Sequence, residues 1–190
     1  MPMNKKVIAV VGDSSVNSDT YELAYDVGCT LVENGYAIQC GGLGGVMEAV
    51  CKGARSSIKY SFGDTIAIIP SYARNQSNAY ADIIIPTGIE IMRNGIVVNA
   101  DAVVAIGGGA GTLSEIALAW SMFKLIIAFN NVNGWGMKLS NQKIDNRNRY
   151  PNIPEDSVYG VSSPKEMVEY LNKYIELYKR QYKGVVWKND

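Results

Sequence analysis

Short runs of aliphatic residues alternate along this chain with longer stretches whose apolar positions recur at helical spacing. The short runs predict six strands, and their continuous hydrophobic character is typical of parallel strands that are buried on both faces. They lie at residues 7–11, 36–39, 65–69, 82–85, 101–106 and 125–129.

The longer stretches predict helices over residues 19–34, 46–57, 89–99 and 112–123, and a last helix from 163 to about 182. Asp19 and Glu22 have the spacing of a capping box at the start of the first helix, and Asn34-Gly35 supplies its end. Ser163-Pro164 marks the start of the last helix, because serine caps helices and proline fits their first position.

This alternation predicts an α/β fold, a Rossmann-like, doubly wound parallel sheet of about six or seven strands with helices on both faces. The 190 residues suit a single nucleotide-binding domain over 1–190. Residues 130–161 are polar and show no clear period. They could form a lid, an oligomer contact or simply an irregular surface excursion of the chain, and the lack of pattern favours the irregular excursion.

Three loops rich in glycine or small polar residues follow predicted strands. Parallel sheets bind ligands at the carboxyl ends of their strands, so the three loops predict one ligand site. We expect it to include Gly12, Ser14 and Ser15 from the first loop, Gly41, Gly42, Gly44 and Met47 around the second, and Gly107, Gly108, Gly109, Gly111 and Thr112 from the third.

The third loop carries the sharpest signal, because four of its five residues before Thr112 are glycines and a predicted helix follows. Glycine lets the backbone approach a ligand closely, and free amides at a helix N-terminus suit a phosphate. A capping box between Thr112 and Glu115 is the alternative explanation for those two residues. The loop lacks the lysine of a Walker motif and the third glycine of the dinucleotide fingerprint, which counts against ATP hydrolysis and NAD binding.

Composition narrows the chemistry further. The chain has no histidine, which removes catalytic triads with histidine and HExxH zinc sites, and its three cysteines lack metal-binding spacing. We therefore expect no metal and no resident cofactor. Eighteen basic residues balance eighteen acidic ones, so the charge gives no attraction to nucleic acid. No apolar run is long enough to cross a membrane, and we expect a cytoplasmic protein.

The chain resembles the LONELY GUY and so-called lysine decarboxylase superfamily over roughly residues 5 to 130. The pattern of Arg93-Asn94, Ala100-Asp101 and the third loop is most similar to the branch related to the molybdenum-cofactor carrier protein. The resemblance to the superfamily as a whole rests on four segments. The segments are 41–54, 86–88, Arg93-Asn94 and 107–115.

The resemblance implies an activity, the cleavage of the N-glycosidic bond of nucleoside 5′-monophosphates such as cytokinin precursors. It implies that Arg93 and Glu115 are the catalytic pair, with Glu115 holding the ribose or stabilising an oxocarbenium-like transition state. Gly109, Gly111 and Thr112 would take the phosphate, and Asn94 would line the site. The chain has Gly107 where those enzymes have proline and Asn94 where they have lysine. The resemblance does not imply lysine decarboxylation.

Two other functions stay open. The chain could be a non-catalytic carrier of an AMP-like or pterin-like molecule, as the branch resemblance implies. A DNA-binding module similar to DNA-processing protein A is the third hypothesis, and the neutral charge counts against it. The resemblance also implies a homodimer or a larger homo-oligomer. Tyr72, Asn78 and Tyr80 in a polar loop could line the base of a ligand.

Overall fold

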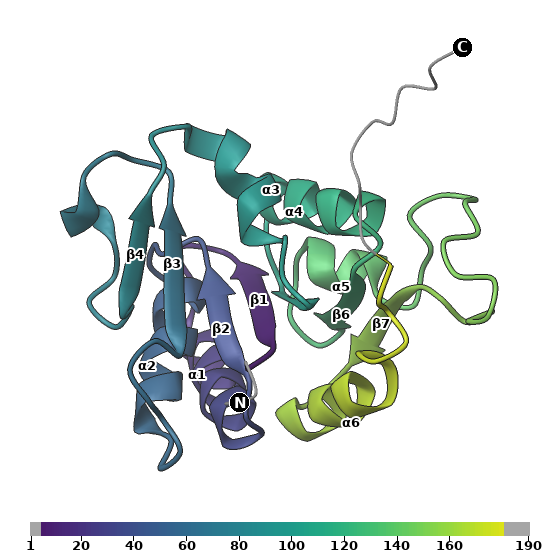
Figure 1. The fold of residues 1–190 in the computed structure, drawn as a ribbon, viewed down its shortest axis with the longest axis horizontal. Coiled ribbons are helices and arrows are strands. Elements are labelled where there is room, and N and C mark those ends of the chain that lie inside the picture. The colour runs from purple at the N-terminus through teal and green to yellow at the C-terminus, as the bar shows by residue number, and fades with distance from the viewer. Residues whose placement is uncertain (1–4, 181–190) are drawn as a thin grey trace.

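Seven strands form a single parallel sheet in the computed structural model, which describes residues 5–180 (Figure 1). This confirms the predicted fold class and the upper value of the predicted strand number. The strands are β1 (Val7–Gly12), β2 (Ala37–Cys40), β3 (Thr65–Ile69), β4 (Ile83–Pro86), β5 (Ala102–Ile106), β6 (Leu125–Phe129) and β7 (Val158–Val161).

The sheet has the order β4-β3-β2-β1-β5-β6-β7, and every adjacent pair is parallel. The chain therefore builds the sheet outward from β1 to one edge, then returns to the other side of β1 and builds outward again. In β1 the side chains of Ile8 and Val10 enter one core and those of Ala9 and Val11 the other. This alternation is the reason that the strand reads as continuously apolar.

Helices cover both faces of the sheet. On one face lie α1 (Ser18–Glu33), α2 (Val46–Ser56) and α6 (Pro164–Tyr174), and on the other lie α3 (Asn94–Val97), α4 (Ala110–Ser121) and α5 (Trp135–Leu139). Two short 3-10 helices, η1 (Arg74–Gln76) and η2 (Glu90–Arg93), occupy the connections around β4. Within residues 5–180, no helix combines the length and the apolar character that a membrane span needs.

Two predicted helix starts differ from the structure. Asn17 caps α1 and accepts the amide of Thr20 at 3.0 Å, so the capping box predicted at Asp19 is wrong. The side chain of Asn17 serves the same purpose two residues earlier. The helix predicted over 89–99 is η2 followed by the four-residue α3. Glu90 has a φ of 50°, a left-handed value that interrupts any regular helix there.

The start of α6 is confirmed, because Ser163 caps it with Pro164 in the first turn. The helix ends at Tyr174, earlier than the predicted end. Residue 182, where we expected that end, lies outside the described part of the chain.

Residues 130–161 are more ordered than the predicted excursion, because they contain α5 and the edge strand β7. Arg149 anchors this segment. Its fully buried guanidinium makes two hydrogen bonds to Asp156, at 3.0 and 2.6 Å, and donates to the carbonyl oxygens of Trp120 and Lys124. It also lies 3.6 Å from the centre of the Trp120 ring. These contacts attach the segment to the end of α4.

Helices α1 and α2 cross with their backbones almost in contact. A Cβ atom added at Gly53 would lie 1.9 Å from the carbonyl oxygen of Tyr25, and one added at Gly28 would lie 2.0 Å from that of Val50. Real Cβ atoms do not approach backbone oxygens so closely, so the two helices depend on glycine at their crossing.

We expect the Gly53→Ala variant to lose about 2 kcal/mol or more of unfolding free energy, because the helices must separate and leave gaps in the core. Urea denaturation measures this. Gly95→Ala in α3 is the matched control, since the added methyl group would have only the Met122 side chain nearby, at 3.8 Å. A Gly53→Ala variant as stable as the control would contradict the close crossing.

Candidate functional site

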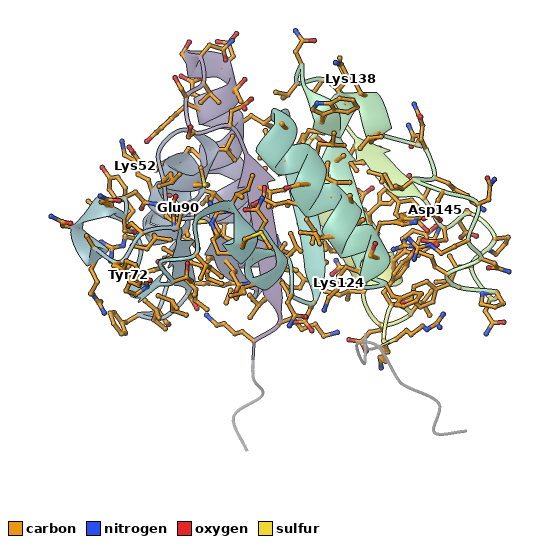
Figure 2. The ribbon with its side chains drawn as sticks, turned by 90° about the horizontal axis from the view of Figure 1, so that it is seen from above. Lys52, Tyr72, Glu90, Lys124, Lys138 and Asp145 are labelled. Atoms are coloured by element: carbon orange, nitrogen blue, oxygen red, sulfur yellow. The ribbon has the colours of Figure 1, made fainter. Side chains whose placement is uncertain are left out.

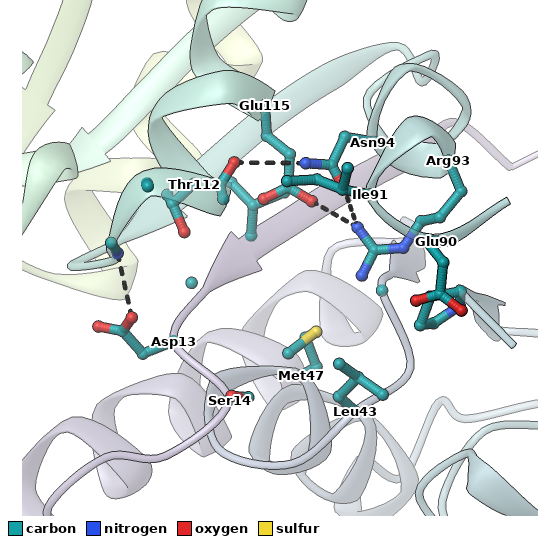
Figure 3. Close-up of a pocket in the computed structure, with 17 residues that line it drawn as sticks. Asp13, Ser14, Leu43, Met47, Glu90, Ile91, Arg93, Asn94, Thr112 and Glu115 are labelled. Carbon is teal, nitrogen blue, oxygen red and sulfur yellow. Dashed lines mark hydrogen bonds and ion pairs between the residues drawn. The ribbon is translucent and has the colours of Figure 1, made fainter.

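The candidate site lies where β1 and β5 run side by side and the strand order reverses. The loops that leave these two strands turn to opposite faces, toward α1 and α4, and so leave a crevice at the carboxyl end of the sheet. A cavity of about 400 Å³ opens there. Its walls come from β1, the β2–α2 loop, η2, α3 and the start of α4 (Figure 3).

Many of the residues predicted from the sequence meet in this cavity. Those that line it are Gly12, Ser14, Gly41, Met47, Arg93, Asn94, Gly109, Gly111, Thr112 and Glu115.

A buried ion pair forms one wall. Arg93 Nη1 lies 3.2 Å from Glu115 Oε1, and both side chains are less than a tenth exposed. Figure 3 shows the guanidinium pointing from η2 toward the carboxylate on α4. The Nε atom of Arg93 is buried and has no hydrogen-bond partner among the described residues. A buried donor without a partner is costly, so the hydrogen bonding of this arginine is incomplete.

Two neighbours fix the position of Arg93. Its Nη1 also donates to Oδ1 of Asn94, whose amide nitrogen donates to Ser114 Oγ at 2.7 Å. A Cβ atom at Gly41 would lie 2.5 Å from Arg93 Nη2. The glycine predicted to contact a ligand therefore also makes room for the catalytic candidate.

Burial raises the pKa of Glu115 to about 7, and the charge and hydrogen bond of Arg93 oppose this increase only in part. The pKa of this carboxyl group therefore lies near neutral pH rather than in the usual range. A group in this state can both accept and donate a proton in a reaction at neutral pH.

The first turn of α4 faces the same cavity. The first amides of a helix have no partner within it, and Ala110, Gly111 and Thr112 carry these amides at the cavity wall. Gly109 is the N-cap residue and has no side chain to cap them, so the alternative of a Thr112–Glu115 capping box is wrong. Free amides and the positive end of a twelve-residue helix can bind an anion here.

The other predicted residues lie outside this cavity. Ser15 lines a neighbouring polar cavity of about 420 Å³. Gly42, Gly44, Gly107 and Gly108 belong to the turns beside the main cavity and do not line it. Asn78 donates to the carbonyl oxygen of Leu43 at 3.2 Å and so supports the β2–α2 loop. Tyr72 is exposed and Tyr80 packs against the core, so neither lines the cavity.

Sequence reasoning missed two acidic lining residues, Asp13 and Glu90. Asp13 lies within the first predicted loop, but only the fold reveals that it contacts the third. Glu90 lies in a stretch that we predicted as ordinary helix, and its unusual φ has no sequence signal.

The chain is similar to several known proteins. An uncharacterized protein from Archaeoglobus fulgidus is 44% identical over 113 residues, which are 59% of this chain and 72% of the relative. The crystal structure of the protein TM1055 has a TM-score of 0.75 and 31% identity, and the match covers 90% of this chain and 99% of that one. The molybdenum cofactor binding protein from Rippkaea orientalis has a TM-score of 0.73 and 30% identity, covering 91% and 99%.

The model of the SLOG cluster4 family matches residues 5–168, which include every element from β1 into α6. This match and the solved relatives confirm the resemblance to the LONELY GUY superfamily and to its molybdenum-cofactor carrier branch. The chain belongs to the SLOG cluster4 family.

Proposed function

We propose that this cavity binds a nucleoside 5′-monophosphate and that Arg93 and Glu115 cleave its N-glycosidic bond. The observation that carries the proposal is the buried ion pair of Arg93 and Glu115 beside the free amides of α4. The amides suit a phosphate, and the ion pair lies on the wall of the same cavity, where a ribose attached to that phosphate could reach it.

Cleavage of an N-glycosidic bond builds positive charge on the ribose as the base leaves, and water then adds to the anomeric carbon. A carboxylate beside the ribose stabilises that charge. The Glu115 carboxylate, with its pKa near 7, accepts the proton that the water loses, and a proton passes to the nitrogen of the base that leaves with the bonding electrons. Arg93 keeps Glu115 in place through their hydrogen bond and supplies a positive charge at the cavity wall.

A carrier without catalysis is the second candidate. It is favoured by the similarity to the molybdenum cofactor binding protein of Rippkaea orientalis. It is also favoured by Asn94, a neutral residue at the position where the related enzymes have a lysine. The same amides would then hold the phosphate of a pterin-like cargo. A cytoplasmic location stays a prediction from the sequence.

A homo-oligomer is proposed from the surface of η2, α3 and α4. Figure 2 looks onto the face of the sheet that these helices cover, with Glu90 beside them. Apolar side chains are exposed along this face, Met92 by 76% and Ile91 by 62%. Ile89, Ile96 and Leu118 are exposed beside them. Several exposed apolar side chains on neighbouring elements are typical of a protein–protein interface.

We expect the protein to release free base from AMP or from cytokinin riboside monophosphates, and the Glu115→Gln variant to be slower by about 100-fold or more because it cannot exchange a proton. Chromatography of the released base measures the rate. Glu169→Gln is the control, since Glu169 is exposed on α6, on the other face of the sheet, and does not line the cavity. Tight AMP binding without any release by pure protein would overturn the hydrolase and support the carrier.

The ionisation of Glu115 can be tested without a substrate. Its pKa is about 7 in the folded protein and about 4.5 as an unperturbed group, so its stabilising contribution is complete below pH 4.5 and is lost as the pH rises through 7. Between pH 5 and pH 8, the unfolding free energy of the wild type should fall by about 2 to 3 kcal/mol relative to Glu115→Gln. Urea denaturation across this range measures the difference. Parallel pH profiles for the two proteins would show that Glu115 titrates normally.

The apolar surface predicts that Met92→Glu will shift the protein from an oligomer to a monomer, because the new charge would be buried in the interface. Sedimentation velocity measures the mass. Ile58→Glu is the matched control, since Ile58 is 95% exposed and lies away from this surface, after α2. A monomeric wild type, or a variant that keeps the oligomer, would exclude this interface.

A further inference from the structure

The carboxylate of Asp13 occupies part of the glycine loop that precedes α4. The amide of Gly108 donates to Oδ2 at 3.1 Å. The amide of Gly109 donates to Oδ1 at 3.0 Å, a contact that Figure 3 marks with a dashed line. Two backbone amides that converge on two anionic oxygens form the contact that a bound phosphate would make. Part of the loop that we assigned to a ligand is therefore filled by an anion of the protein itself.

The main chain at Asp13 is held in place independently of this contact. The carbonyl oxygen of Asp13 accepts the amide of Val46 at the start of α2, at 3.0 Å. A Cβ atom at Gly45 would lie 2.3 Å from the same oxygen, so the two loops are packed tightly. Loss of the side-chain contact would therefore leave the backbone of this loop attached to α2.

The side chain of Asp13 has space to move. It lies between the main cavity and the neighbouring polar cavity, and it lines both. The second cavity offers hydroxyl and amide groups from Ser15, Asn17 and Asn133. Because the bond to Gly109 is exposed to solvent, the carboxylate can leave the loop without being buried elsewhere.

The cavity is lined by more acidic than basic side chains, so the negative charge of Asp13 affects the binding of an anion. Among the described residues that line it, Arg93 is the only cation, whereas Asp13, Glu90 and Glu115 are acidic. A phosphate that bound the first amides of α4 would meet the Asp13 carboxylate beside it, and like charges at such separation repel strongly. Binding therefore requires the carboxylate to leave the loop.

We propose that Asp13 is an internal competitor for the phosphate and sets the specificity of the site. This inference rests on the proposed binding of a nucleoside monophosphate. Inorganic phosphate alone displaces the carboxylate poorly. A phosphate joined to a nucleoside gains further contacts in the cavity, so it displaces the carboxylate and takes the amides of Gly108 and Gly109. Asp13 thus excludes simple anions from a site whose amides would otherwise bind them.

The test compares Asp13→Asn with the wild type in calorimetric titrations with AMP, adenosine and inorganic phosphate at constant ionic strength. We expect the Kd for AMP to fall by about tenfold, because the ligand no longer has to displace a charged competitor. Inorganic phosphate should gain at least as much, whereas adenosine should bind with unchanged affinity. Asp26→Asn removes the same charge from the exposed side of α1, outside both cavities, and is the matched control, for which no change is expected.

A purely structural role for Asp13, as an external cap of α4, gives the opposite result. The loop would loosen without the carboxylate, and AMP would bind more weakly to Asp13→Asn. That result, or equal affinity, overturns the inference. The Asp13→Ser variant, which keeps a small acceptor without charge, provides a second measurement and should also bind AMP more tightly.

The amide NMR signals of Gly108 and Gly109 separate this inference from the proposed function. In the wild type they should shift on AMP addition as the carboxylate is replaced by phosphate. AMP binding by the wild type that leaves these signals unchanged overturns the role of Asp13 and leaves the proposed binding intact. No AMP binding by any of the proteins overturns the proposed function, and the inference with it.

Discussion

The reversal of strand order between β1 and β5 is the constraint on which the site depends. The two strands pair over five residues, from Ile8–Ala102 to Gly12–Ile106, so their ends are level. Their loops nevertheless turn to opposite faces of the sheet. The crevice between them brings Asp13 into contact with Gly108, 95 positions away in the sequence. The β2–α2 loop and η2 close the same crevice from the side, and the cavity is therefore a consequence of topology before any side chain is considered.

Residues 5–180 contain two buried arginine–carboxylate pairs, and the difference between them distinguishes a structural pair from a functional candidate. Arg149 makes two hydrogen bonds to Asp156, two more to backbone carbonyls, and stacks on Trp120, so the bonds it would make to water are replaced. Arg93 makes one bond to Glu115 and leaves its Nε without a partner among the described residues.

Burying charges is unfavourable unless their hydrogen bonds are satisfied, so the second pair is a poor way to stabilise a fold. Its incomplete bonding and the raised pKa of Glu115 are typical of a site that is completed by a ligand.

The sequence was sufficient for the parts of the fold that depend on local pattern. The six predicted strands agree with the structure to within a residue or so at each end, because buried parallel strands are continuous apolar runs. The seventh strand was missed because Val158–Val161 is a four-residue edge strand that includes a glycine and follows a polar segment. Its position depends on Arg149 and its contacts with α4, which no local pattern reveals.

The candidate site was predictable as a set of loops but not as a set of contacts. The resemblance indicated Arg93 and Glu115 together, and the structure places them in contact. Spacing alone suggested that Thr112 and Glu115 cap a helix. The helix begins two residues earlier, at Ala110, so Glu115 lies beyond the first turn and turns to Arg93. Asp13 could not be assigned because its role depends on a partner in another loop.

The glycines of the third loop fall into two groups, and glycine is needed in each group for a different physical reason. Gly107 and Gly108 have φ values of 61° and 96°, and a Cβ atom at either would clash, with Asn133 or with Thr112. The fold requires these two glycines whether or not a ligand binds. Gly109 and Gly111 have no such clash and face the cavity. Their lack of side chains opens the amides of α4, so the part of the motif that indicates a ligand is its second half.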